Sequence, residues 1–143
     1  MNHLQKLIII LLIIFPITGH PQCDSKLEDE CCSSIGQFKF LKSFSIDLKK
    51  NKSSRVSVAL NSGIRYKISY CNAANCSCNA IIKVITTVHG NEQILGMTYN
   101  PNTKKHYTSI EFNCQKTGVY FLDFSFEDGN KGCSACILSV ESW

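Results

Sequence analysis

A regular alternation of apolar and polar residues near the carboxyl end is the feature that most constrains how this chain folds. Apolar side chains occupy every second position of two segments that are separated by a turn at residues 127–130. They are Tyr120, Leu122, Phe124 and Phe126 in the first segment, and Cys136, Leu138 and Val140 in the second. Because successive side chains of a β-strand point to opposite faces, this pattern predicts a β-hairpin with one apolar face. Such a hairpin is marginally stable alone in water, so other strands must cover it.

Similar segments recur along the chain from residue 35 onwards. The expected strands lie within residues 38–48, 56–60, 66–70, 82–88, 93–99 and 110–114. Clusters of glycine, asparagine and proline separate them, and no stretch shows the apolar period of an amphipathic helix. Eight or nine short strands joined by tight turns predict an all-β fold, an antiparallel β-sandwich formed by residues 35–143.

Two turns share one arrangement of residues. Gly63 precedes Tyr66, and Gly118 precedes Tyr120, so a tyrosine follows each glycine turn and opens a strand. A tyrosine in this position can bury its ring and bond its hydroxyl to the loop backbone, as in the tyrosine corner of sandwich domains. We therefore expect both hydroxyl groups to bond loop backbone.

Three segments resemble bacterial pre-peptidase C-terminal domains: Gly63-Ile64-Arg65-Tyr66, residues 110–112 (IEF) and residues 117–124 (TGVYFLDF). Related GOLD-type sandwiches share the pattern, which extends over residues 38–140. The resemblance implies a jelly-roll-like β-sandwich that is usually attached to a secreted enzyme or a surface protein and has no catalytic residues of its own. This chain differs from that family in its many cysteines and in the lack of an attached enzyme.

The first 22 residues have the pattern of a signal peptide. Lys6 precedes an apolar run over residues 7–15, which Pro16 and Gly19 close. This run is too short to span a bilayer but has the length of a signal-peptide core. Cleavage after Gly19 and cleavage just before Cys23 both fit this signal-peptide pattern. No later segment is long and apolar enough for a membrane helix, so we expect a secreted or periplasmic protein without stable membrane insertion.

Nine cysteines also favour an oxidising compartment. They are Cys23, Cys31, Cys32, Cys71, Cys76, Cys78, Cys114, Cys133 and Cys136. Four disulfide bonds and one unpaired cysteine account for the odd number, and the sequence leaves the pairing open. Residues 23–34 are polar, acidic and rich in cysteine, without a strand period. We expect this leader to lie on the sandwich, held by disulfide bonds.

Cys133 and Cys136 form the motif that most resembles a chemical site. A C-x-x-C pair that is redox-active normally stands at the start of a helix, whereas this one enters a strand. Bonding of each cysteine to a different partner is the favoured interpretation. The alternative is a thiol-active or metal-binding protein that uses this pair, with Cys71, Cys76 and Cys78 as further possible zinc ligands.

Catalytic patterns are weak elsewhere. His89 and His106 stand beside turns, without a second histidine at ligand spacing, and we expect both to be exposed. Glu111, Asp123 and Glu127 are acidic, but the sequence does not place two of them together as glycoside hydrolysis requires. We therefore predict no catalytic residue, no cofactor and no metal, and the chain is not expected to be an enzyme.

The predicted function is binding or a structural role. The formal net charge of +4, to which Lys6 contributes, is too small and too scattered to indicate nucleic acid as the partner. A secreted protein or a surface glycan fits an exported sandwich. The loops at residues 49–54, 71–79 and 100–106 are the expected contact regions, because binding residues are often carried by loops on a rigid scaffold.

Overall fold

A computed structural model describes residue 23, residues 26–74, residue 76 and residues 78–142. The predicted signal peptide, residues 1–22, lies outside the described residues. The strands are β1 (Phe38–Leu48), β2 (Ser54–Leu60), β3 (Arg65–Asn72), β4 (Ala80–Val88), β5 (Asn91–Met97), β6 (Tyr99–Asn100), β7 (Lys105–His106), β8 (Ser109–Asn113), β9 (Gly118–Phe126) and β10 (Gly132–Glu141). The helical elements are α2 (Lys26–Cys32) and the 3-10 turns η1 (Ser33–Ile35) and η2 (Glu127–Gly129).

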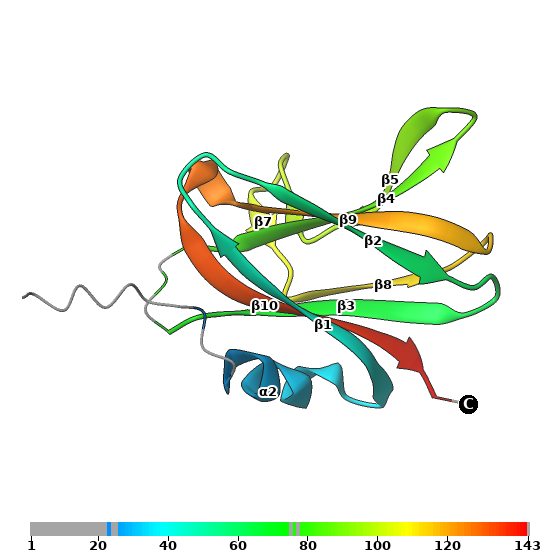
Figure 1. Cartoon of the computed structure of the whole chain (residues 1–143), viewed down its shortest axis with the longest axis horizontal. Coiled ribbons are helices and arrows are strands. Elements are labelled where there is room, and N and C mark those ends of the chain that lie inside the picture. Colours follow the sequence, from blue (N-terminus) through cyan, green and yellow to red (C-terminus); the bar gives the residue numbers. More distant parts are fainter. Residues whose placement is uncertain (1–22, 24–25, 75, 77, 143) are drawn as a thin grey trace, which may run out of the picture.

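Two antiparallel four-stranded sheets face each other and form a sandwich (Figure 1). Sheet A has the strand order β1-β10-β3-β8, and sheet B has the order β2-β9-β4-β5. The short strands β6 and β7 pair with each other beside the sandwich. This architecture confirms the predicted all-β antiparallel sandwich. The described residues hold ten strands, because the segment between β5 and β8 contains the two-residue strands β6 and β7.

The strand order is that of a jelly roll. β1 pairs with β10, β2 with β9, β3 with β8, and β4 with β5. The chain is thus paired as one long hairpin, interrupted by β6 and β7, and this hairpin is rolled so that alternate pairs fall in opposite sheets. The expectation of a jelly-roll-like topology is confirmed.

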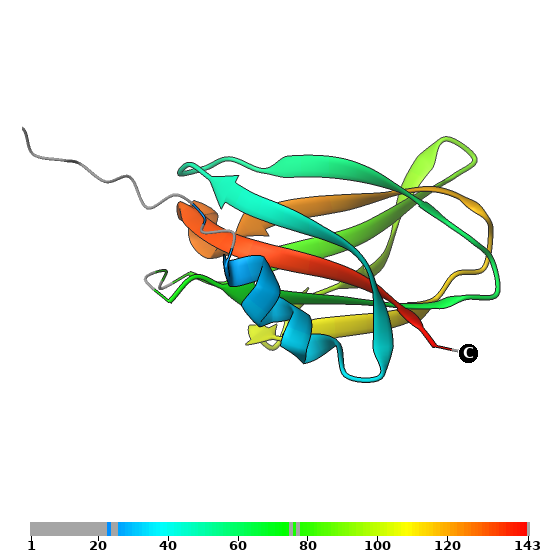
Figure 2. The same cartoon turned by 60° about the horizontal axis from the view of Figure 1, so that its bottom comes forward.

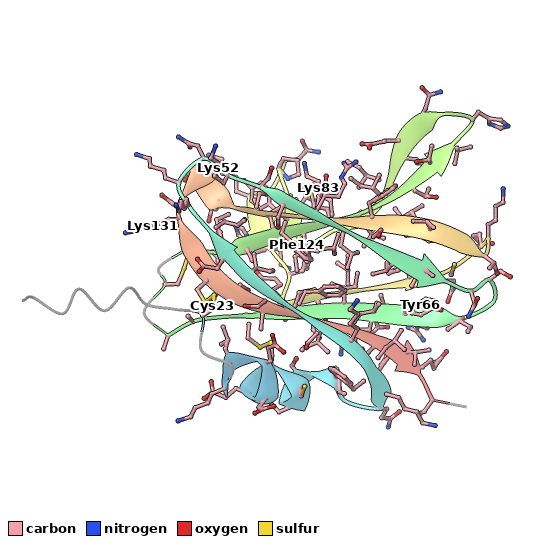
Figure 3. All side chains as sticks on the ribbon, in the orientation of Figure 1. Cys23, Lys52, Tyr66, Lys83, Phe124 and Lys131 are labelled. Atoms are coloured by element: carbon pink, nitrogen blue, oxygen red, sulfur yellow. A yellow bond between two sulfur atoms is a disulfide. The ribbon has the colours of Figure 1, made fainter. Side chains whose placement is uncertain are left out.

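Strands β9 and β10 supply the centre of the core, but the predicted β-hairpin is wrong. β9 pairs with β2 and β4 in sheet B and β10 pairs with β1 and β3 in sheet A, so the turn between them carries the chain from one sheet to the other. Tyr120, Leu122, Phe124 and Phe126 are all buried and face sheet A, as the alternation predicts. Figure 3 shows Phe124 between the two sheets. In β10 the burial is continuous from Cys133 to Ser139, so this strand is covered on both faces. A second layer must therefore lie on the outside of sheet A.

Helix α2 provides that second layer (Figure 2). Leu27 and Cys31, four residues apart on one face of the helix, are buried against Ala135 and Ile137 of β10. No helix is expected from the sequence pattern, so the prediction is wrong for residues 26–32. An isolated helix of this length is unstable in water, and tertiary packing is what stabilises it. No helix within the described residues is long and apolar enough to cross a membrane.

Both predicted tyrosine corners are present. The Tyr120 hydroxyl donates a hydrogen bond to the backbone carbonyl of Lys116 at 2.6 Å. The Tyr66 hydroxyl accepts one from the backbone N–H of Asn61 at 3.0 Å. Each ring is buried in the core, so each bond fixes a loop to the end of a central strand.

Candidate functional site

Disulfide bonds attach the leader to sheet A. Cys23 is bonded to Cys133, and Cys31 to Cys71. A third bond joins Cys76 and Cys78 within the loop between β3 and β4. Bonds of this kind are typical of a secreted or periplasmic protein.

Three cysteines remain outside these bonds, where the sequence pattern predicts one. They are Cys32, Cys114 and Cys136. Cys114 and Cys136 are buried in the core, where a free thiol packs as a small apolar side chain. The Cys114 thiol also lies 3.3 Å from the Tyr120 hydroxyl, and burial with this contact raises the pKa of Tyr120. The structure thus has three disulfide bonds where four were expected, and burial in the core accounts for the free thiols of Cys114 and Cys136 but not for that of Cys32.

The C-x-x-C pair is not a redox or metal pair in this structure. Cys133 and Cys136 stand three positions apart in β10, so they point to opposite faces of the strand. Cys133 is bonded to Cys23 on the outside of sheet A, whereas Cys136 lies in the core, where burial strongly raises the pKa of its thiol. The hypothesis that these two thiols act together is therefore wrong. Within the described residues, no three cysteine, histidine or acidic side chains are grouped to hold a metal.

The predicted acidic residues also lie apart. Glu111 of sheet A forms an ion pair with Arg65, whereas Asp123 of sheet B forms one with Arg55. The Glu127 carboxylate lies 3.1 Å from Nε2 of His106. The structure does not bring these carboxylates together as two acids flanking one bond.

His106 differs from its expected position. It is half-buried, its ring centroid lies 4.6 Å from that of Tyr99, and Glu127 faces its Nε2. Glu127 also contributes, after burial, to the raised pKa of Tyr70. These contacts tie β7 to η2. The prediction of an exposed side chain holds for His89 and is wrong for His106.

Two of the predicted contact loops meet at one end of the sandwich. We call this the loop end and define it as residues 49–53, 73–74, 76, 78–79 and 127–131. The backbone N–H of Asn51 donates to the Gly129 carbonyl at 2.7 Å, and that of Glu127 donates to the Asn79 carbonyl at 3.0 Å. Figure 3 shows Lys52 and Lys131 both at this end of the sandwich. The loop end is therefore a surface of exposed lysines on loops that backbone hydrogen bonds hold together.

The most prominent surface element is the tip of the β4–β5 hairpin, residues 86–95. Figures 1 and 2 both show it projecting beyond the two sheets. Val88, Ile94 and Leu95 are 44%, 53% and 40% exposed. Ile94 is opposite Ile85 in the register of the hairpin, three positions from Val88, so Ile94 and Val88 point to opposite faces and neither face of the tip is covered. The tip exposes apolar side chains on both sides.

A tight turn closes this hairpin. Val88 pairs with Asn91, which leaves His89 and Gly90 as the two turn residues. Both have positive φ, +50° for His89 and +81° for Gly90, as a type I′ turn requires. This turn matches the right-handed twist of the strands, so it favours the conformation that the hairpin adopts here.

An ion-pair network braces the hairpin near its tip. Arg55 of β2 donates two hydrogen bonds to Asp123 of β9, and it also donates to both carboxylate oxygens of Glu92 in β5. Its guanidinium lies 5.3 Å from the centroid of the Phe121 ring. The hydrogen bond from Arg55 lowers the pKa of Glu92, and the hydrogen bonds to Asp123 and Glu92 raise the pKa of the guanidinium itself. Nothing in the sequence alone identifies this network, because it depends on which strands are neighbours.

Comparison with known proteins gives a likeness among solved structures. No known family profile matches the chain, and no curated protein matches it. Among solved structures, it is similar to the crystal structure of Aeromonas hydrophila PliG, a periplasmic lysozyme inhibitor of g-type lysozyme. The TM-score is 0.53 at 9% sequence identity, and the match covers 69% of this chain and 84% of that chain. The likeness shows a shared fold.

Proposed function

We propose that this chain is an exported, non-catalytic protein that binds another protein outside the cytoplasm through the tip of the β4–β5 hairpin. Residues 1–22 act as the signal peptide in this proposal. The observation that carries it is the projecting tip, with Val88, Ile94 and Leu95 exposed on both of its faces.

The physical basis is a preformed apolar element. Exposed apolar side chains that gather on one projecting element are typical of contact sites, and a few such residues supply most of the affinity of an interface. The type I′ turn and the Arg55 network hold the tip in place, so little conformational entropy is lost on binding. A tip of this shape fits a concave partner better than a flat one.

The structural neighbour supports the class of partner. PliG is a periplasmic inhibitor of a lysozyme, so a protein with this fold acts by binding an enzyme. We propose a secreted or periplasmic hydrolase as the partner of this chain, with inhibition as the result. The disulfide bonds support the same compartment.

The test compares the wild-type protein with an Ile94→Ser/Leu95→Ser variant. Both are immobilised and exposed to the periplasmic and secreted proteins of the source organism, and bound proteins are identified by mass spectrometry. Activity of g-type lysozyme is measured in parallel. We expect a hydrolase that binds the wild type and is lost with the variant. Phe40→Ser is the matched control, since Phe40 is equally exposed but lies on β1. Equal binding by all three proteins would contradict the proposal.

The loop end favours a second candidate, binding of an acidic surface glycan. Lys49, Lys50, Lys52 and Lys131 are exposed there on neighbouring loops. Co-sedimentation with an acidic polysaccharide at rising salt concentration tests this candidate. It predicts binding that salt weakens and that Lys50→Gln/Lys52→Gln/Lys131→Gln abolishes, while the hairpin variant binds normally. Binding that is unchanged in the triple variant would exclude it.

A further inference from the structure

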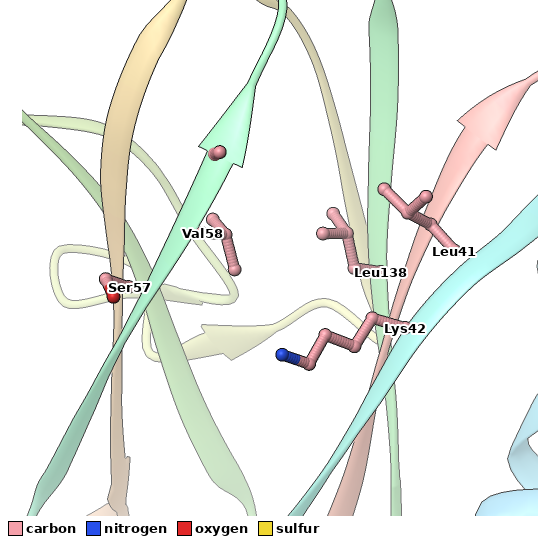
Figure 4. Close-up of a pocket in the computed structure, with 6 residues that line it drawn as sticks. Leu41, Lys42, Ser57, Val58 and Leu138 are labelled. Carbon is pink, nitrogen blue, oxygen red and sulfur yellow. The ribbon is translucent and has the colours of Figure 1, made fainter.

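The sandwich has a pocket at one of its two open sides. It lies between the edge strand β1 of sheet A and the edge strand β2 of sheet B. The pocket has a volume of about 290 Å³. Its lining residues are Leu41, Lys42, Ser57, Val58, Ala59 and Leu138 (Figure 4).

The floor of the pocket belongs to the core. Val58 of β2 and Leu138 of β10 are both buried, and Figure 4 shows their side chains facing each other across the opening. Leu41 is exposed and forms part of the rim. An apolar chain that enters here would therefore contact aliphatic side chains at the rim and at the floor.

Lys42 adds a positive charge at the exposed rim of the pocket. It is directly opposite Leu138 in the register of β1 and β10, and Figure 4 shows its ammonium group reaching from β1 toward β2. The ammonium lies 5.3 Å from the centroid of the Phe44 ring. None of the ion pairs found among the described residues involves Lys42, so its charge is not neutralised by a carboxylate there.

A β-bulge places Leu41 beside Lys42 in the pocket. The register of β1 against β10 shifts between Phe40 and Lys42, so Leu41 has no partner residue in β10. In a regular strand, consecutive side chains point to opposite faces and do not line the same pocket. Bulges often occur where a side chain must be redirected. Here the bulge combines an aliphatic and a cationic side chain at one rim.

We propose that this pocket binds a fatty acid of medium chain length. The carboxylate pairs with the Lys42 ammonium, and the hydrocarbon chain contacts Leu41, Val58 and Leu138. The volume is near the lower end of ligand pockets, which run from roughly 300 to 1,000 Å³, and this favours a medium over a long chain. This site is independent of the hairpin tip.

Titration of the full protein with sodium decanoate, followed by NMR of the methyl groups, tests the proposal. We expect saturable shifts of the methyl signals of Leu41, Val58 and Leu138. Decyltrimethylammonium has the same chain length and the opposite charge, so it should not give these shifts. No saturable shift up to millimolar decanoate, or equal shifts with both compounds, would overturn the proposal.

Substitution of Lys42 distinguishes two roles for this side chain, binding of a ligand and protection of the edge strand β1 against pairing with another chain. Inward-pointing charges on edge strands discourage pairing with other chains, and Lys42 could serve that purpose alone. We expect Lys42→Gln to weaken decanoate binding about tenfold or more, because a charged hydrogen bond is lost. Lys39→Gln is the control, since Lys39 is an exposed lysine of β1 that does not line the pocket. Equal affinity of the two variants would overturn the proposal.

Discussion

The side-chain hydroxyl of Thr98 accepts a hydrogen bond from the backbone N–H of Ile82 at 2.9 Å. The backbone N–H of Thr98 in turn donates to the Ile82 carbonyl at 3.0 Å. Thr98 directly follows the end of β5 and is fully buried. Its hydroxyl therefore accepts the hydrogen bond of a β4 backbone N–H at the point where β5 no longer continues as a strand. The base of the projecting hairpin is thereby held to the sandwich.

Replacement of this hydroxyl by a methyl group should destabilise the fold. Thr98→Val leaves the N–H of Ile82 buried without its partner, which costs about 1–3 kcal/mol. Chemical denaturation measures the change in the free energy of unfolding. Thr98→Ser keeps the hydroxyl and should lose less. An equal loss in both variants would show that packing, and not the hydrogen bond, is what matters.

The unpaired cysteines should differ in reactivity. We expect iodoacetamide to modify Cys32 in the native protein and to leave Cys114 and Cys136 unmodified, because Cys32 is partly exposed and the other two are buried. The raised pKa of Cys136 further lowers its fraction of reactive thiolate. Peptide mass spectrometry identifies the modified sites, and labelling in denaturant should reach all three. Native labelling of Cys136 would contradict its position in the core.

The brace of the hairpin should weaken in acid. Because the hydrogen bond from Arg55 lowers the pKa of Glu92, the folded state favours the carboxylate, and its contribution is present above the ordinary value of 4.5. That contribution is lost as the pH falls through the lowered pKa. Protection factors from amide hydrogen exchange of β5, each taken relative to the intrinsic exchange rate at the same pH, measure the effect. We expect Glu92→Gln to show low protection factors already at neutral pH and little change in them with acid.

The disulfide bond from the helix should matter more than the bond within the loop. Cys31 and Cys71 are 40 residues apart, so Cys31→Ser/Cys71→Ser should destabilise the protein by about 2–5 kcal/mol and release α2 from β10. The control is Cys76→Ser/Cys78→Ser, because that bond spans a separation of 2 and restricts the unfolded chain far less. Thermal unfolding compares the two variants. A larger loss in the control would contradict this account.

The sandwich could be predicted because its signals are local. The alternation that runs through Phe124 predicts the buried face of β9, and the glycine turn before Tyr120 predicts its corner. Neither local signal shows that β9 and β10 lie in opposite sheets. Helix α2 could not be predicted in this way. Its buried face consists of Leu27 and Cys31, which is too few residues to show a period, and its stability comes from disulfide bonds and from β10.

The candidate binding surfaces depend on neighbours that are distant in the sequence. Arg55 is 37 residues from Glu92 and 68 from Asp123, and only the order of strands in sheet B brings them together. His106 and Glu127 are also distant in the sequence, and the fold brings them into contact. Leu41 and Lys42 share a pocket because of a bulge that the alternating pattern does not reveal.

The pairing of β1 with β10 fixes the order of events when the protein is made. The first strand completes its hydrogen bonds only with the last, and Cys23 finds its partner Cys133 at a separation of 110 residues. Sheet A therefore stays incomplete until β10 has been synthesised and released. Contacts of such long range also make folding slow. We therefore expect the closure of sheet A by β1 and β10 to be among the last steps of folding.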